Sequence, residues 1–275
     1  MTRLTRSALA VAGAAALALG LAACGANGSG DPAPTEGEGL GTLSVGATAV
    51  PAGELLQFVA DELAPAEGLT LEIQEYSDYN TPNPALAQGA NDANLFQHAP
   101  FLDLYVQDSG EDLVEVGPVY LPPLALYSEK VDTLEDLPDG ATIALPNDAS
   151  NEARALLLLA GAGLIETTDS PTTISDITAN PHGFEFSEID AATLPAALKQ
   201  MDAGIVNFNF ASAAGISSDL QLLSEGQDSE YFNILATRAE LADDPRIEKL
   251  YELLTSDEAK AWIEETYDGL VIPAE

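Results

Sequence analysis

From residue 42 onward, short apolar stretches that predict β-strands alternate with patterns that predict helices. The first series comprises strands 42–47, 70–75 and 92–96 and helices 54–63, 85–88 and 100–107. The second comprises strands 142–145, 184–188 and 204–207 and helices 152–161 and 194–201, and amphipathic helices 247–254 and 257–267 close the chain, with Ser256 capping the last. This alternation is typical of an α/β fold with a largely parallel sheet.

Two extended segments are predicted to connect two such α/β units. Residues 114–127 contain Pro118, Pro122 and Pro123, and because proline does not fit a central strand, we expect this segment to link two sheets. Residues 231–237 have the pattern of a second crossing. Two lobes joined by two crossings predict a hinge and a ligand cleft at the carboxyl ends of strands. We expect lobe I to comprise residues 42–121 and 236–275, and lobe II residues 122–235.

The beginning of the chain has the pattern of a bacterial lipoprotein signal. A basic start precedes residues 7–23, which carry no charge, and Leu-Ala-Ala-Cys at 21–24 resembles a lipobox, whose cysteine becomes the lipidated N-terminus. We expect residues 1–23 to be a signal peptide, Cys24 to be lipidated and the Gly/Pro/Ser/Glu-rich residues 24–41 to form a flexible linker. The alternative is an ordinary secretory peptide with a coincidental cysteine. As the only cysteine, it excludes an internal disulfide.

The charge balance restricts the partners. The chain has 9 Lys+Arg against 45 Asp+Glu, for a net charge of −36. Two of the cations, Arg3 and Arg6, belong to the predicted signal peptide, so the part from Cys24 onward is more acidic still. Such a surface repels phosphate backbones and anionic lipid. We therefore expect no nucleic-acid partner, and membrane contact through the lipid anchor only.

The stretch 144–159 contains the clearest candidate for an anion site. A strand end is followed by a turn at 146–148, and Ser150 or Asn151 is a good N-cap for the next helix. Arg154 would then lie in the first turn, where free N–H groups and a guanidinium together can bind a carboxylate. The alternative is a surface arginine paired with one of the many acids.

Other candidate ligand contacts also follow predicted strands. Tyr79 follows strand 70–75. Phe96 ends strand 92–96, and His98 and Phe101 follow it. Asn207 ends strand 204–207, and Asn209 follows it. Aromatic rings can line a pocket, and an amide can pair with both an ammonium and a carboxylate. Asn233 lies between apolar neighbours in the second crossing and so needs a polar partner. The structural alternative is that Phe96 is core, His98 and one asparagine cap helices, and Tyr79 packs on the surface.

Signatures of catalysis are missing from the sequence. It has no Gly-x-Ser-x-Gly, Walker, dinucleotide-binding or His-Glu-x-x-His pattern, and the lipobox accounts for its one cysteine. Its two histidines, His98 and His182, do not have metal-ligand spacing. We expect a protein that is not an enzyme and that needs neither a cofactor nor a metal.

Several blocks together resemble a known family. Residues 92–103 (DANLFQHAPFLD) and 146–159 (PNDASNEARALLLL), followed by Gly-Leu-Ile at 163–165, are similar to the methionine-binding lipoproteins of the MetQ/NlpA type. The weaker blocks 77–83 and 206–212 fit in the same order, and the resemblance covers about residues 42–270. These proteins are the substrate-binding components of methionine ABC importers. The resemblance implies a two-lobed periplasmic-binding-protein-like fold.

The resemblance also implies roles for individual residues. The positions matching Arg154 and Asn151 bind the ligand's carboxylate, those matching Asn207 and Asn233 complete its hydrogen bonds, and those matching Tyr79, Phe96 and His98 line its side-chain pocket. Phe101 stands where the family usually has tyrosine, which leaves another apolar amino acid or a short peptide as the alternative to L-methionine or a close analogue. A secreted hydrolase or a structural surface lipoprotein is the alternative from another class.

The implied partners are an ABC permease and its ATPase. The implied location is the extracytoplasmic face of the cell membrane, with the protein a lipid-anchored monomer.

Overall fold

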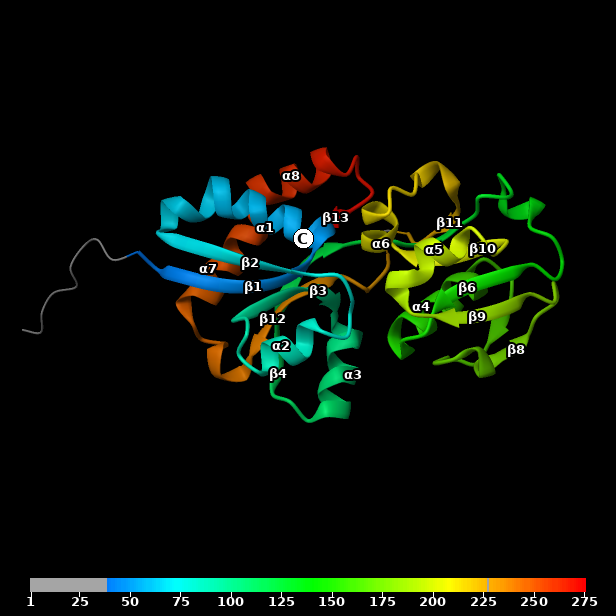
Figure 1. The fold of residues 1–275 in the computed structure, drawn as a ribbon, viewed down its shortest axis with the longest axis horizontal. Coiled ribbons are helices and arrows are strands. Elements are labelled where there is room, and N and C mark those ends of the chain that lie inside the picture. The colour runs from blue at the N-terminus through cyan, green and yellow to red at the C-terminus, as the bar shows by residue number, and fades with distance from the viewer. Residues whose placement is uncertain (1–38, 227) are drawn as a thin grey trace, which may run out of the picture. The chain divides into compact units, whose positions relative to one another are not determined.

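The computed structural model describes residues 39–226 and 228–275 (Figure 1). The predicted signal peptide, Cys24 and most of the predicted linker lie outside the described residues. None of the described helices is long and apolar enough to cross a membrane.

The first lobe is built on a six-stranded sheet with the order β13-β4-β12-β3-β1-β2. Its strands are β1 (Gly41–Thr48), β2 (Leu69–Tyr76), β3 (Ala93–His98), β4 (Leu113–Leu121), β12 (Asn233–Arg238) and β13 (Ile272–Pro273). Its helices are α1 (Glu54–Phe58), within helical turns that continue to Glu67, α2 (Pro82–Ala87), α3 (Ala99–Ser109), α7 (Pro245–Leu254) and α8 (Asp257–Thr266). Ser256 caps α8 as predicted, because its hydroxyl accepts from the backbone N–H of Ala259 at 3.2 Å.

The second lobe is built on a five-stranded sheet with the order β11-β5-β10-β6-β9. Its strands are β5 (Leu124–Tyr127), β6 (Thr142–Pro146), β9 (Glu185–Ile189), β10 (Ala203–Asn207) and β11 (Gln221–Ser224). Its helices are α4 (Ala149–Gly161), α5 (Leu194–Leu198) and α6 (Phe208–Ala213), and β7 (Glu166–Thr167) pairs with β8 (Ile177–Ala179) in a small separate hairpin. Figure 1 shows these elements beside those of the first sheet, with α6 between the two.

The prediction of largely parallel sheets is wrong, because both sheets are mixed. Parallel pairing is confined to β3-β1-β2 in the first sheet and β10-β6-β9 in the second. The neighbours β4, β12, β5 and β11 pair antiparallel. The helix-connected units predict the parallel strands correctly. Most antiparallel pairs involve β5 and β12. The chain enters these two strands directly from a crossing instead of through a helix, so nothing requires them to run parallel to their neighbours.

Two segments connect the sheets. Residues 114–127 do link the sheets, since β4 belongs to the first, β5 to the second, and Pro122 and Pro123 lie between them. In the second crossing the whole of β12 pairs within the first sheet, so the chain passes between the sheets before Asn233. We propose a boundary between Ser224 and Asn233 for the end of lobe II, in place of residue 235.

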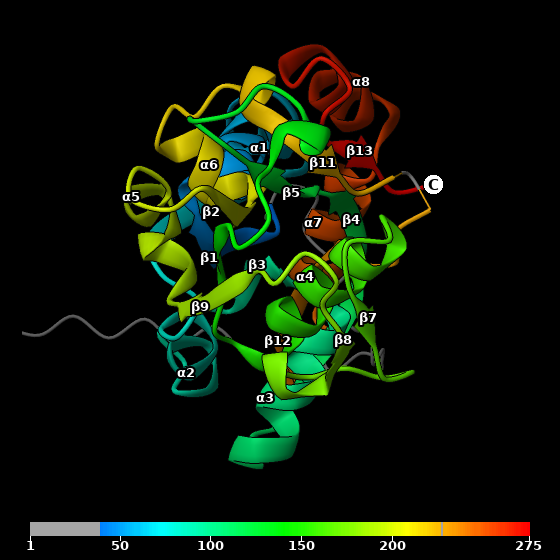
Figure 2. The same ribbon diagram turned by 90° about the vertical axis from the view of Figure 1, so that its right-hand side faces the viewer.

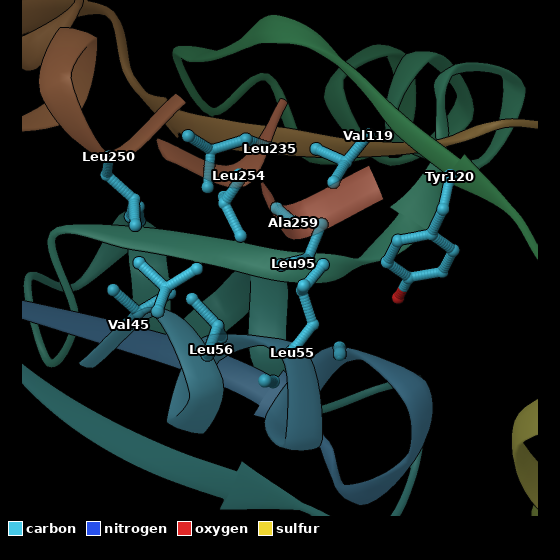
Figure 3. Close-up of a cluster of buried hydrophobic side chains, with 14 of the residues drawn as sticks. Val45, Leu55, Leu56, Leu95, Val119, Tyr120, Leu235, Leu250, Leu254 and Ala259 are labelled. Carbon is cyan, nitrogen blue, oxygen red and sulfur yellow. The ribbon is translucent and has the colours of Figure 1, made fainter. Parts of the chain in front are cut away.

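Apolar side chains from both faces of each sheet form the cores. In the first lobe Val45, Leu95 and Leu235 of the sheet pack against Leu55 of α1 and Leu250 of α7 (Figure 3). In the second lobe, alternate residues of β6 face opposite layers. Ile143 and Leu145 contact the α4 layer, whereas Ala144 contacts the α5 and α6 layer. Figure 2 shows α4 on one side of β9 and α5 and α6 on the other.

Candidate ligand-binding site

A pocket lies between the two lobes, and about 320 Å³ within it is not filled by protein atoms, part of this volume being open to solvent. Twelve side chains line it: Tyr79, Phe96, Gln97, His98, Phe101, Pro122, Asn151, Arg154, Asn207, Phe208, Asn209 and Asn233. All eight residues predicted to contact a ligand are among them. They come together because β2, β3, β6 and β10 end at the cleft and the loops or helices that follow them turn into it.

One wall of the pocket is aromatic. The ring of Tyr79 lies 6.0 Å from that of Phe96, 5.9 Å from that of Phe101 and 4.8 Å from that of Phe210, a residue of α6 in the second lobe. The Tyr79 hydroxyl donates a 2.5 Å hydrogen bond to Asn209 Oδ1, also of α6. Burial raises the pKa of Tyr79, so its hydroxyl stays protonated. This wall suits an uncharged, flexible side chain.

A chain of hydrogen bonds crosses the pocket from His98 to the second lobe. His98 Nδ1 accepts from the backbone N–H of Phe101 at 3.3 Å, so the ring caps α3 as well as facing the pocket. Its Nε2 is 3.4 Å from Asn151 Oδ1 and is therefore the nitrogen that carries the proton. Burial lowers the pKa of His98 to about 3, so the imidazole is neutral at physiological pH.

Asn151 and Asn207 continue this chain. Asn151 Nδ2 donates to Asp148 Oδ1 at 2.9 Å, which orients its Oδ1 toward His98 and toward the Asn207 Nδ2 group at 2.8 Å. Asn207 Oδ1 then has no hydrogen-bond partner within residues 39–226 and 228–275, although the residue is only 6% exposed. An unpaired buried acceptor at a pocket wall is a site for an ammonium or hydroxyl donor from a ligand.

Two asparagines that the sequence alone could not assign differ in their contacts. Asn209 Oδ1 is occupied by the Tyr79 hydroxyl, whereas Asn207 Oδ1 is available. Asn233 Nδ2 lies 3.4 Å from the hydroxyl of buried Tyr120, which is the polar partner that its apolar neighbours led us to expect.

The start of helix α4 differs from the prediction. Asp148, with an extended backbone, is the N-cap, and its carboxylate accepts from the backbone N–H of Asn151 at 3.0 Å. Ser150 and Asn151 are already helical, so neither is the cap. Arg154 consequently lies in the second turn of α4, not in the first as predicted.

Arg154 is held on several sides. Its Nε donates to Glu225 Oε1 at 2.7 Å, and its NH2 group donates to Glu225 Oε2 and, at 3.0 Å, to the Pro122 carbonyl. The ring of Tyr231 lies 4.7 Å from the guanidinium carbon, within cation–π distance. Arg154 is 2% exposed, so the surface-arginine alternative is wrong about its location but right that an acid pairs with it. No described residue accepts a hydrogen bond from NH1, which is left for a ligand.

Sequence reasoning missed Glu225, Gln97, Pro122 and Phe208. Gln97 joins a buried amide network with Asn83 and Asn94, in which Gln97 Nε2 donates to Asn83 Oδ1 at 2.7 Å. This network ties helix α2, which contains Asn83, to β3. Its sequence signal is a run of polar residues within a fully buried strand, which predicts mutual hydrogen bonding.

Glu152, next to Asn151 on α4, is a buried acid outside the pocket. It is 2% exposed, and its Oε1 accepts from the backbone N–H of Ile174 at 2.7 Å. Burial, with a smaller contribution from the neighbouring Glu188 carboxylate, raises the pKa of Glu152 to about 7. Below about pH 7 the folded protein therefore favours the protonated form of the Glu152 side chain.

We expect the raised pKa of Glu152 to make stability fall as pH rises from about 4.5 to 7. In that interval the folded state holds a proton that the unfolded state has lost, so ionisation opposes folding, by up to about 3 kcal/mol above pH 7. Glu152→Gln, which keeps the acceptor for Ile174, should gain stability relative to wild type across this range. Urea unfolding at several pH values measures the difference. Glu166→Gln, at an exposed position of the same lobe, is the control and should give a flat difference.

No group of three His, Cys, Asp or Glu side chains in the described part of the chain could hold a metal ion. His182 is partly exposed, its Nδ1 lies 3.0 Å from Asp139 Oδ1, and it is not among the residues that line the pocket.

Comparisons with known proteins agree with this geometry. Residues 43–275 match the family model described as NlpA lipoprotein. The methionine-binding lipoprotein MetQ of Bacillus subtilis is 37% identical over 240 residues, which are 83% of this chain and 86% of that protein. The D-methionine-binding lipoprotein MetQ of Salmonella typhi is 37% identical over 223 residues, 78% of this chain and 81% of that protein.

Solved structures show the same fold. A nutrient binding protein from Burkholderia cenocepacia, bound to methionine, has a TM-score of 0.80 and 39% identity over 85% of this chain and 100% of that one. A periplasmic substrate-binding protein of an ABC transporter from Coxiella burnetii has a TM-score of 0.81 and 40% identity over 84% of this chain and 100% of that one. The prediction of a two-lobed periplasmic-binding-protein-like fold is thereby confirmed.

Proposed function

Because this chain belongs to the NlpA lipoprotein family, we propose that it is the substrate-binding component of an ABC importer and that it binds L-methionine or a close analogue. Several relatives are named as binding or transport proteins, and one solved relative holds methionine. The partners would be a membrane permease and its ATPase, to which a monomeric binding protein delivers the amino acid. No catalytic step and no cofactor is part of this proposal.

The observation that carries the proposal is the pairing of two polar groups beside one apolar wall. The Arg154 NH1 group supplies donors for a carboxylate, with Asn151 nearby on the same helix. The unpartnered Asn207 Oδ1 supplies an acceptor for an ammonium. An α-amino acid has both charged groups on one carbon and directs its side chain away from them. The rings of Tyr79, Phe96 and Phe101 would receive that side chain.

Phe101 favours one alternative ligand. The ring of Phe101 lies 5.8 Å from that of Phe96 and has no hydroxyl group, so this wall is less polar than it would be with a tyrosine. The less polar wall would favour the binding of another apolar amino acid, such as leucine. The second candidate is therefore the same transport function with a different apolar amino acid.

Native mass spectrometry of protein purified without added ligand tests the proposal. A bound mass equal to methionine, displaced by excess methionine, is the expected result. Isothermal titration after unfolding and refolding then compares L-methionine, D-methionine, leucine and methionine methyl ester. Binding of leucine but not methionine would select the alternative, and turnover of an ester or peptide would contradict a transport role.

We further propose that the protein is anchored by lipid on Cys24 at the extracytoplasmic face of the membrane. We expect Cys24→Ala to move it from the membrane to the soluble fraction. A single acyl chain binds a bilayer only marginally, so firm attachment requires several chains on this cysteine. Cell fractionation with a high-salt wash measures the change. Ser29→Ala, within the same predicted linker, is the control and should leave the protein in the membrane fraction, whereas a membrane-bound Cys24→Ala would refute the anchor.

A further inference from the structure

The pocket arginine has a carboxylate partner within the protein. Glu225 binds the Nε and NH2 edge of Arg154, and the two side chains are 9% and 2% exposed. Glu225 is itself fixed, because its Oε2 accepts from the backbone N–H of Leu124 at 2.9 Å and its own N–H donates to the Leu124 carbonyl at 3.1 Å. Leu124 begins β5, directly after the first crossing. Glu225 itself does not line the pocket, but through these bonds it holds Arg154 in the pocket wall.

This ion pair makes the pocket electrically neutral. Of the twelve side chains that line it, only Arg154 carries a charge at physiological pH, since His98 is neutral and Tyr79 is protonated. Glu225 cancels the charge of Arg154. A ligand that brings a carboxylate without an ammonium would add a second negative charge to a guanidinium that is already neutralised, in a place with little water. A zwitterion adds no net charge.

We propose that Glu225 is a specificity-determining residue, which restricts the pocket to zwitterionic amino acids and rejects carboxylic acids that lack the ammonium group. This inference rests on the proposed function, because it assumes that an amino acid binds at Arg154. Glu225 acts through Arg154 and leaves only its NH1 edge to the ligand carboxylate. The negative charge of Glu225 also attracts the ligand's ammonium, which increases the difference in affinity between amino acids and carboxylic acids that lack the ammonium.

Glu225→Gln tests this role against a matched pair of ligands. The probes are L-methionine and 4-(methylsulfanyl)butanoate, which has the same side chain and carboxylate but a hydrogen in place of the ammonium. It is smaller than methionine, so steric exclusion cannot explain weak binding. Titration calorimetry gives both dissociation constants for wild type, Glu225→Gln and the control Glu230→Gln, which alters an exposed acid of the same segment.

We expect Glu225→Gln to bind the butanoate more tightly than wild type does, by about tenfold or more, because the repulsion between two carboxylates at one guanidinium is removed. The preference for methionine over the butanoate should fall by a similar factor, and Glu230→Gln should change neither. A gain of binding cannot come from a damaged fold. If Glu225→Gln is unstable alone, the butanoate should restore folding and raise its melting temperature more than it raises that of wild type.

The outcomes separate the two proposals. If wild type binds no α-amino acid at all, the proposed function fails. If wild type binds methionine but Glu225→Gln shows no gain for the butanoate, or neither folds nor is rescued by it, only the role of Glu225 is overturned.

Discussion

Arg154→Ala is expected to reduce methionine binding by about 30-fold to several thousand-fold, which corresponds to the roughly 2–5 kcal/mol typical of truncating one partner of a buried charge pair. A ligand carboxylate in the pocket has lost its water and requires a fixed cation. Arg154→Lys should recover little of this loss. An ammonium cannot bind Glu225, the Pro122 carbonyl and the ligand at once in the planar geometry that the guanidinium provides.

The Glu225 contact adds a structural consequence to this prediction. Removing Arg154 alone leaves a buried carboxylate unpaired, which typically costs about 3–5 kcal/mol of stability. The double variant Arg154→Met/Glu225→Gln removes both charges and should recover most of that stability while still failing to bind methionine. Calorimetric titration and thermal unfolding of the single and double variants distinguish the two effects. Lys130→Ala, which breaks an exposed pair with Asp202 in the same lobe, is the control and should retain full affinity.

Binding within a fewfold of wild type by the folded double variant would show that the carboxylate site lies elsewhere. Loss of binding by Lys130→Ala as well would point to a general effect of net charge. The acidic surface makes this control necessary, because each lost cation increases the repulsion between the protein and any anion.

The parts of the fold that are local in the sequence were predictable. The helix-connected strands β1, β2, β3, β6 and β10 all follow from apolar runs bounded by turn residues, and the cap at Ser256 follows from residue type alone. The antiparallel strands were harder to predict from the sequence. β11 and β13 are short, and their place depends on pairing with β5 and β4, which are distant in the chain. Pairing of this kind is a tertiary property.

The pocket shows the same division between local and distant information. The resemblance to a family, read from blocks around His98 and Arg154, identified eight residues that do line one pocket. It could not identify Glu225, which is 71 positions from Arg154 and is one of 45 acids without a distinguishing pattern. The N-cap was misplaced because Asp148, Ser150 and Asn151 are all good caps, and only the backbone angles select among them.

Asn207→Leu is expected to weaken methionine binding while leaving the stability of the protein without ligand nearly unchanged. The side chains have similar shapes, but leucine removes Oδ1, the buried acceptor that has no partner among the described residues. Losing a hydrogen bond to a charged ammonium should cost about 1.5–3 kcal/mol of binding, roughly a 10- to 150-fold loss of affinity. Removing the unsatisfied acceptor should favour the folded state by about 1 kcal/mol. Leucine also removes the Asn207 Nδ2 hydrogen bond to Asn151 Oδ1, which costs about the same, so the two effects on the free energy of unfolding nearly cancel.

A large loss of affinity with little change in stability is the signature of a polar group kept for its ligand. Asn209→Leu is the matched control two residues away, since Asn209 Oδ1 already accepts from the Tyr79 hydroxyl. That substitution leaves a buried phenol without its acceptor, so it should lower stability rather than leave it nearly unchanged. Titration calorimetry and urea unfolding of both variants measure the two quantities. If Asn207→Leu is less stable than wild type and binds methionine equally well, Asn207 has a structural role and the ammonium has another acceptor in the pocket.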